Sequence, residues 1–361
     1  MSLAGAGKGE IEPPVLGPDH GFNVPVGVGV CQASLSCSPV IRRTAVSTAL
    51  LVWSLFSALP ARAQGLPAYR PVNPVADSRT ALGFEPYRTP GPGRWSGSLA
   101  LDYGSAIEHA FKPSARYDLD SEILRLRLSV ARAVGTRGFV ELDAGVGAGY
   151  PGFLDGFLDW YHGLIGVTLR DRERRPRNAF LYQLELPDCE LLTRRSTGVF
   201  LGDARLSAGM RLGRHLQTVA TVTLPTSTAP AGYGRGVVAG GVVTTVRAPL
   251  GRRVIYEGSL GAGYTPRHGD LTAYQRTTFL SGSSGLRWRF WGRQSIYGNV
   301  FVHSPYYHDT TIAALDQREL SFDFGWILAT RSGREWRLGL TEDLEPSGPG
   351  IDLVFRLGVT R

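Results

Sequence analysis

RWSGSLALDY (residues 94–103) is the stretch that decides the fold of this 361-residue chain. Trp95, Leu99, Leu101 and Tyr103 alternate with polar residues such as Asp102. Because successive side chains of a strand point to opposite faces, this alternation predicts a strand with one apolar and one polar face. A length of about ten residues suits a tilted strand that crosses a membrane.

The same alternation recurs along the chain. It occupies residues 124–130, 140–150, 204–212, 254–264, 286–290, 320–326, 336–340 and 351–359. A soluble sandwich also alternates, but its aromatic residues would scatter. Here they gather at the ends of the apolar faces, as in the two interface girdles of a membrane barrel. The predicted girdle residues are Trp95, Tyr103, Tyr150, Tyr264, Trp288, Trp326 and Trp336.

The connections between these segments alternate in length. Short, arginine-bearing turns are predicted at Gly135–Gly138, Gly213–His215, Pro249–Arg253, Trp291–Gln294 and Arg331–Arg334. Longer loops are predicted at Gly104–Asp120, Pro151–Gly202, Pro225–Arg235, Thr265–Ala273, Ser304–Gln317 and Asp343–Gly350. Short periplasmic turns and long extracellular loops are typical of an outer-membrane barrel. The sequence therefore predicts an all-β, antiparallel up-and-down barrel of about 12 strands (10–14) over residues 94–361, and the β-like segment Asn178–Leu186 leaves the number open.

The composition excludes several function classes. The net charge of +8 comes almost wholly from scattered arginines, which do not form the dense basic stripe of a nucleic-acid-binding protein. Only Cys189 follows the apolar run of residues 45–59, so no disulfide is predicted in the processed chain. We expect no cofactor, and nothing in the sequence predicts the oligomeric state.

The N-terminal region has the features of a secretory signal. Arg42 and Arg43 precede an apolar run that is shorter than a membrane helix, and Ala61 and Ala63 provide small residues for cleavage before Gln64. A single-pass anchor is the alternative. We predict an untranslated or non-structural extension at 1–40, a cleaved signal peptide at 41–63 and a Pro-rich lead at 64–93, with export to the outer membrane of a Gram-negative-type bacterium.

Three motifs carry a resemblance to a known family. Gly152–His162 (GFLDGFLDWYH), Leu201–Leu206 (LGDARL) and Thr223–Ser227 (TLPTS) resemble an uncharacterised family of Gram-negative outer-membrane proteins catalogued as a domain of unknown function. The likeness covers Val72 to the C-terminus. It implies a barrel in the outer membrane and no catalytic or ligand residue. The chain departs from common outer-membrane chains by ending on Arg361 instead of an aromatic residue, although Phe355 can serve the assembly machinery that we expect as a partner.

Charged residues of both signs face away from the apolar stripes, in balanced numbers. We therefore predict a narrow or occluded lumen lined by salt bridges, with an open pore as the alternative. The predicted lumen charges are Arg125, Arg127, Glu141, Asp143, Asp203, Arg205, Arg211, Glu257, Arg287, Arg289, Asp323, Arg337, Asp352 and Arg356.

One segment of the longest loop has helical spacing. Phe153, Phe157 and Tyr161 share a face, and Trp160 lies beside them, so we predict a short amphipathic helix over Gly152–Ile165 that covers the barrel mouth as a lid. The alternative is an anchor in the outer leaflet. On the other face, Asp155, Asp159 and His162 are weak candidates for metal ligands.

The resulting functional prediction is a narrow or gated channel or a structural envelope component, in contact with outer-membrane lipid and lipopolysaccharide. The alternative is an outer-membrane enzyme that acts on lipid or lipopolysaccharide. His303 and Ser304 are the candidates for that reaction, but adjacent residues of a strand point to opposite faces, so we expect them to form no dyad.

Overall fold

The computed structural model describes residues 65–80, 82–88, 94–166, 176–187, 189–193, 196–345, 348–349 and 351–361. All of them belong to one compact unit, Val52–Arg361. The predicted extension at 1–40 and the predicted signal peptide at 41–63 lie outside the described residues. No helix among the described residues is long and apolar enough to cross a membrane.

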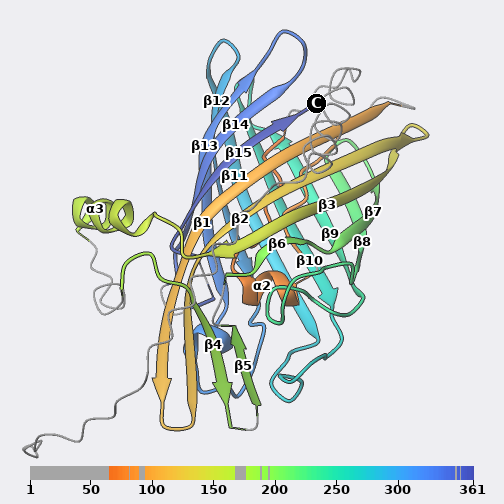
Figure 1. Cartoon of the computed structure of the whole chain (residues 1–361). Helices are drawn as coiled ribbons and strands as arrows, with labels where there is room; N and C mark the ends of the chain where they lie inside the picture. Colours follow the sequence, from red (N-terminus) through yellow and green to blue (C-terminus); the bar gives the residue numbers. More distant parts are fainter. Residues whose placement is uncertain are drawn as a thin grey trace, which may run out of the picture. The chain divides into compact units, whose positions relative to one another are not determined.

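Twelve antiparallel strands form a closed ring (Figure 1), which confirms the predicted fold class. They are β1 (Trp95–Lys112), β2 (Ala115–Val134), β3 (Gly138–Tyr150), β7 (Ala204–Arg211), β8 (Leu216–Leu224), β9 (Ala239–Pro249), β10 (Val254–Tyr264), β11 (Thr278–Trp291), β12 (Gln294–His303), β13 (Glu319–Ala329), β14 (Glu335–Asp343) and β15 (Leu353–Thr360). The ring closes because β1 pairs with both β2 and β15. The five predicted short turns all connect strands at one end of the barrel, here called the turn end, and the opposite end is called the loop end.

Three further strands lie at the loop end. β6 (Gly198–Leu201) pairs with the loop-end half of β3, and β7 pairs with the turn-end half. The two short strands therefore lie end to end along the same side of β3. β4 (Leu181–Leu186) and β5 (Cys189–Thr193) form a hairpin that pairs with β2 at Arg116–Asp120. The β-like segment in the second loop is therefore a hairpin beside the ring, and the number of barrel strands stays at twelve.

The predicted loop Gly104–Asp120 is wrong, because β1 and β2 remain paired through it and turn only at residues 113–114. The reason lies on the β1 side, where each face mixes apolar and polar residues: Ala106 shares a face with Glu108, and Phe111 shares the other with His109. Residues 115–121 of β2 do alternate, but without a recognisable partner strand they were assigned to the loop.

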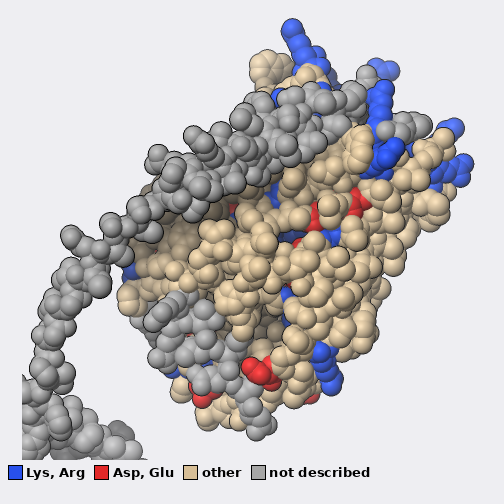
Figure 2. All heavy atoms as spheres, turned by 45° about the vertical axis from the view of Figure 1, so that its right-hand side comes forward, with Lys and Arg blue, Asp and Glu red and all other residues tan. Residues whose placement is uncertain are grey.

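The outer face of the ring is apolar. Leu126, Leu142, Leu206, Leu260 and Leu338 all point outward with at least a third of their surface exposed. Figure 2 shows the resulting wall of uncharged residues, with Lys and Arg gathered at the turn end, uppermost in this view. An exposed apolar band of this kind is stable only against lipid.

The predicted girdle residues lie near the ends of this band. Trp95, Trp288, Trp326 and Trp336 lie toward the turn end, and Tyr103, Tyr150 and Tyr264 lie toward the loop end. Among them Trp95, Trp288, Trp336 and Tyr264 are exposed.

The polypeptide ahead of β1 runs inside the barrel. Residues 65–88, here called the insert, contact β10, β13, β2 and β15 through Leu66, Tyr69 and Arg70. Its two limbs are joined by an antiparallel bridge between Tyr69 and Phe84. The tip is helix α2 (Pro74–Arg79), drawn in orange within the ring in Figure 1. The insert therefore enters and leaves the lumen at the turn end and points toward the loop end.

Local sequence explains the tip. Asn73 caps α2 by accepting a hydrogen bond from the Val75 amide, and Pro74 occupies the first turn, where a missing N–H costs nothing. Val72, Val75, Ala76 and Leu82 then bury their side chains in a core that also includes residues of the loops at the loop end, such as Leu271, Tyr306 and Ile312. Full burial of a side chain the size of valine or leucine contributes about 1.5–3 kcal/mol.

Candidate functional site: a lumen closed by the insert

A buried carboxylate lies at the centre of the lumen. Asp102 on β1 pairs with Arg125 at 3.0 Å, and Arg127 and Arg356 approach it at 3.9 Å. Arg356 also lies 3.7 Å from Asp323, and all of these atoms are largely shielded from solvent. The register places Asp102 directly opposite Arg125 on one side and Arg356 on the other. This cluster spans the wall from β2 through β1 and β15 to β13.

The wall arginines of this cluster also hold the insert. Arg125 donates to the carbonyl oxygens of Pro71 at 2.6 Å and Arg70 at 3.2 Å, and Arg356 donates to the Arg70 carbonyl at 3.1 Å. The Arg356 guanidinium lies 4.7 Å from the centre of the Tyr69 ring, within the range of a cation–π interaction. Each of these arginines thus lies between wall carboxylates and a carbonyl oxygen of the insert.

Two more arginines, one on the wall and one in the loop between β8 and β9, bind the insert elsewhere along its length. Near the turn end, Arg287 donates to the Gly65 carbonyl at 3.0 Å and pairs with Glu335 at 2.7 Å. Near the loop end, Arg235 donates to the carbonyl of Asp77 at 2.8 Å and to that of Thr80. The barrel therefore holds both the start and the tip of the insert.

Side chains of the insert complete the contacts. Arg70 pairs with Glu85 within the insert, and Arg88 pairs with Glu141 on β3 at 2.6 Å. Glu257 on β10 accepts a hydrogen bond from the Leu66 amide at 3.0 Å. Tyr69 donates to Glu319 at 3.0 Å, which also accepts a hydrogen bond from Tyr306. Burial and the Glu319 carboxylate raise the pKa of Tyr306 well above 10, so this loop phenol stays a donor.

Inward-facing glycines make room for the apolar side chains of the insert. A Cβ atom on Gly241 of β9 would lie 2.7 Å from Leu82, and one on Gly263 of β10 would lie 3.0 Å from it. A Cβ atom on Gly285 of β11 would lie 2.8 Å from Leu66. These distances are shorter than carbon atoms tolerate, so the wall and the insert are complementary in shape.

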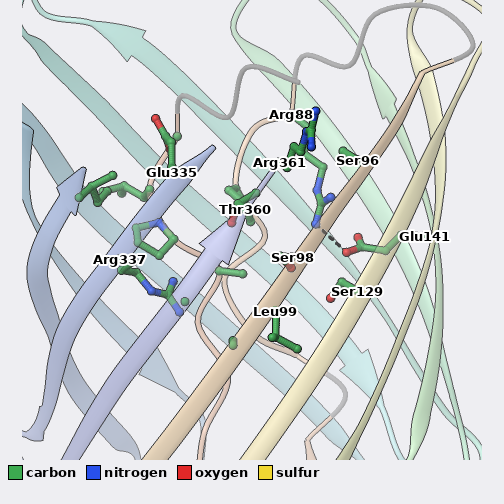
Figure 3. Close-up of a pocket in the computed structure, with 18 of the residues that line it drawn as sticks. Arg88, Ser96, Ser98, Leu99, Ser129, Glu141, Glu335, Arg337, Thr360 and Arg361 are labelled. Atoms are coloured by element: carbon green, nitrogen blue, oxygen red, sulfur yellow. Dashed lines mark hydrogen bonds and ion pairs between the residues drawn. The ribbon is translucent and has the colours of Figure 1, made fainter. Parts of the chain in front are cut away.

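A cavity of about 660 Å³ lies between the insert and the turn end. Its walls carry side chains from both the insert and the strands, and Figure 3 shows Arg337, Thr360, Ser98, Ser129 and Glu141 around it. The acidic residues Glu141, Asp143 and Glu335 are paired with Arg88, Arg127 and Arg287. The cavity is a polar vestibule, and the insert is its floor.

Most of the predicted lumen charges lie in this interior. Those that face the insert, the central cluster or the vestibule are Arg125, Arg127, Glu141, Asp143, Arg205, Glu257, Arg287, Asp323, Arg337 and Arg356. The other four lie at the ends of the barrel. Arg211 and Arg289 bond carbonyls of the turns, Asp203 pairs with Arg235 beside α2, and Asp352 lies 3.1 Å from His162. The alternation along a strand predicts which face a side chain lies on but not its position along the barrel axis, so the pattern did not separate these four from the central charges.

The predicted lid lies elsewhere. Helix α3 (Asp155–Ile165) forms, but it packs on the outside of the barrel, where Leu154 and Leu158 contact Leu353, Tyr103 and Phe355. Phe153 and Tyr103 stack at 5.5 Å, and Phe157 lies 5.7 Å from Phe355. Figure 1 shows α3 beside the wall. The loop end of the lumen is already occupied by α2 and its apolar core, so the apolar face of α3 packs on the apolar outer wall instead.

The position of α3 matches the anchor that was the alternative to a lid. Phe153, Trp160 and Leu164 are 69%, 62% and 70% exposed, at the loop end of the lipid-facing band. Tyr161 donates to Glu342 at 2.6 Å, and this hydrogen bond together with burial raises the pKa of Tyr161 to about 12.

The three weak metal candidates do not converge. Asp155 accepts a hydrogen bond from the Asn178 amide, Asp159 pairs with Arg177, and His162 pairs with Asp352. Within the described ranges, no group of three potential metal ligands comes together.

The histidine and serine considered for catalysis also have structural partners. His303 is fully buried, and its Nε2 atom lies 2.8 Å from the Thr80 hydroxyl of the insert. The Ser304 hydroxyl accepts a hydrogen bond from the Leu280 amide. His303 therefore fixes the end of α2.

The insert is the main feature that the sequence did not predict. We predicted only a Pro-rich lead for residues 64–93, because their apolar residues follow neither helical nor strand periodicity. Two signals were available: the Asn73-Pro74 pair that starts α2, and the run of inward-facing glycines at positions 241, 263 and 285. Glycine on the polar face of a strand often marks close approach of another backbone or side chain.

Comparison with known proteins agrees with this fold. An outer membrane channel from Pseudomonas putida F1 aligns over 76% of this chain and 97% of its own, with 14% sequence identity and a TM-score of 0.50. The NanC porin aligns over 73% and 98%, with 7% identity and a TM-score of 0.40. The translocator domain of the autotransporter NalP from Neisseria meningitidis aligns over 88% and 97%, with 12% identity and a TM-score of 0.38. No family model and no curated protein sequence matches the chain. The chain has the fold of outer-membrane barrels of Gram-negative bacteria.

Proposed function

We propose that this protein is a gated outer-membrane channel whose insert closes the lumen at rest. The observation that carries the proposal is the insert itself, which is bound by arginines of the strands and of one loop from its first residues to its tip. A barrel that served only as a structural component would be stabilised as well by side chains of its own wall. A separate segment held through its carbonyl oxygens can leave without breaking the ring of strands.

The topology supports withdrawal toward the turn end. Both limbs of the insert end there, at Gly65 and Arg88, so the insert can retract as a loop without threading a chain end through the barrel. Once it leaves, the charged wall around Asp102 and the vestibule would line a continuous polar passage. A lumen with paired charges of both signs suits small polar solutes better than a strongly selective ion path.

This proposal includes export through a cleaved signal peptide and membership of the uncharacterised outer-membrane family that the three motifs resemble. For the alternative of an enzyme acting on lipid or lipopolysaccharide, the serine and histidine considered above bond other groups: the Ser304 hydroxyl accepts from the Leu280 amide, and His303 Nε2 contacts the Thr80 hydroxyl.

Deletion of residues 65–88 tests the proposal. We expect the shortened protein to conduct continuously in planar bilayers, whereas the full-length protein conducts only in brief openings. The fold is checked by the different migration of unheated and boiled protein in detergent gels, since a closed ring of strands resists unfolding. A correctly folded deletion variant with the conductance of the full-length protein would rule out the insert as the gate.

A further inference from the structure

The turn end of the barrel carries a rim of arginines. Arg137, Arg214, Arg252, Arg253, Arg293 and Arg331 lie in the five short turns, and all six are exposed. Arg94, Arg132, Arg211 and Arg289 lie on the adjoining strand ends or next to them. Figure 2 shows basic side chains gathered toward the upper end of the molecule.

Acidic side chains do not neutralise this rim in the part of the chain that the structure describes. The acidic residues nearest to it are Glu141, Glu257 and Glu335, and each of them faces the lumen beside an arginine. The loop end differs, because there arginines pair with acidic neighbours, as Arg177 does with Asp159 and Arg318 does with Glu345. Among the described residues, the arginines without an acidic partner are therefore concentrated at the turn end of the barrel.

The aromatic girdle sets the depth of the rim in the membrane. Trp95, Trp288, Trp291 and Trp336 are exposed on the outer face at this end, and tryptophan prefers the interface between acyl chains and head groups. The Arg132 guanidinium lies 5.4 Å from the centre of the Trp95 ring. The arginines of the turns lie just beyond this level, where lipid phosphates are found.

Neighbouring turns are tied together by two of the rim arginines. Arg211 donates to the carbonyl of Thr136 in the β2–β3 turn, and Arg289 donates to the carbonyl of Arg252 in the β9–β10 turn at 2.9 Å. These contacts hold adjacent turns in fixed positions. The guanidinium groups of the turns are thus spread around the barrel on a rigid base.

From this arrangement we propose that the arginine rim binds the phosphate groups of anionic phospholipids in the inner leaflet of the outer membrane. Guanidinium groups bind phosphate through paired N–H donors, and each basic residue at an anionic membrane surface adds to the attraction. A rim that encircles the barrel outside the girdle fits a lipid annulus. The rim would fix the depth of the barrel and keep the turn end toward the periplasm, whether or not the barrel conducts.

Lipid retention by the full-length protein tests the proposal. The protein is reconstituted in nanodiscs that contain phosphatidylcholine with a minor fraction of phosphatidylglycerol, released into detergent, and its bound lipids are counted by native mass spectrometry. The variant carries Arg→Gln at positions 137, 214, 252, 253, 293 and 331. The control carries Arg116→Gln, Arg177→Gln, Arg267→Gln and Arg318→Gln at the loop end.

We expect the rim variant to retain roughly tenfold less phosphatidylglycerol and the control to retain as much as the unmodified protein. Equal retention by the rim variant, or an equal loss in the control, would overturn the proposal. Glycerol 3-phosphate added to the unmodified protein separates free phosphate from lipid: displacement of the bound lipid at millimolar concentration would mean that the rim binds soluble phosphates instead.

A smaller change guards against misfolding of the rim variant. Arg252→Gln with Arg253→Gln changes a single turn and is checked by heat-dependent migration in gels. We expect a loss of about two- to threefold in retained phosphatidylglycerol from this pair. No loss in the folded pair would contradict a contribution of this turn to the rim.

Discussion

Arg356 is the residue on which wall and insert most depend. Its guanidinium is fully buried among Asp102, Asp323, the Arg70 carbonyl and the Tyr69 ring. Arg356→Ala leaves two buried carboxylates without their shared cation, and such losses cost about 3–5 kcal/mol. We expect a lower temperature for the change in gel migration and more frequent channel openings.

The matched control is Arg318→Ala. Its ion pair with Glu345 is exposed at the loop end, and exposed pairs contribute about 1 kcal/mol or less. The two variants should therefore differ clearly in the urea concentration at which they unfold from detergent micelles. Similar midpoints for both would show that the central cluster does not stabilise the closed barrel.

For single residues, the sequence predicted which face of a strand a side chain lies on. It predicted less well which groups that side chain contacts. Alternation along β15 was enough to point Arg356 inward and Phe355 outward. It was not enough for Asp352, because the contact with His162 comes from a helix whose docking site depends on the tertiary structure. It also gave no sign that wall arginines would bind backbone carbonyls, since no side-chain pattern encodes such acceptors.

Among the elements, the close contact between β9 and the insert can be tested by substitution of a glycine. Gly241 faces the lumen, where an added Cβ atom would lie 2.7 Å from Leu82. Its neighbour Gly240 faces outward, and a Cβ atom there would have only an ordinary contact of 3.5 Å with the Thr221 carbonyl. We expect Gly241→Val to displace the insert and raise the open fraction in planar bilayers, and Gly240→Val to leave it unchanged. Equal effects of the two would point to altered strand pairing instead.

For helix α3 we expect a substitution or deletion to leave conduction unchanged. Because it packs on the outer wall and leaves the lumen free, deletion of residues 153–164 should not change single-channel conductance. It should instead expose Leu353 and weaken the attachment of the loop end to the membrane interface. The measurement is conductance of the folded deletion variant, and a larger conductance would restore the lid that the sequence suggested.

The elements show why prediction succeeded for the strands and failed for the insert. Each strand of the ring separates lipid from a polar interior, so its two faces differ and its sequence alternates. The insert contacts the wall on all sides, and no solvent or lipid boundary imposes a period on it. The extension of β1 over residues 104–112 escaped prediction because each of its faces mixes apolar and polar residues.

The molecule as a whole is a twelve-stranded barrel with a separate segment of its own chain in the lumen. Shape and charge both favour the closed state, since glycines on three strands accommodate apolar side chains of the insert while arginines on four strands or loops bind it. If the insert is the gate, conduction requires movement of the insert relative to the wall. Fluctuations of side chains alone are not sufficient.

A reversible link between insert and wall measures this movement most directly. Leu82→Cys and Gly263→Cys place two thiols where a Cβ atom at Gly263 would lie 3.0 Å from the Leu82 Cγ atom, close enough for a disulfide, in a background of Cys189→Ser. Single-channel recordings are made on one preparation before and after reduction. We predict that the oxidised protein shows no openings and that a reducing agent restores them. Openings of the same size and frequency in the fully oxidised protein would contradict a lumen that opens by displacement of the insert.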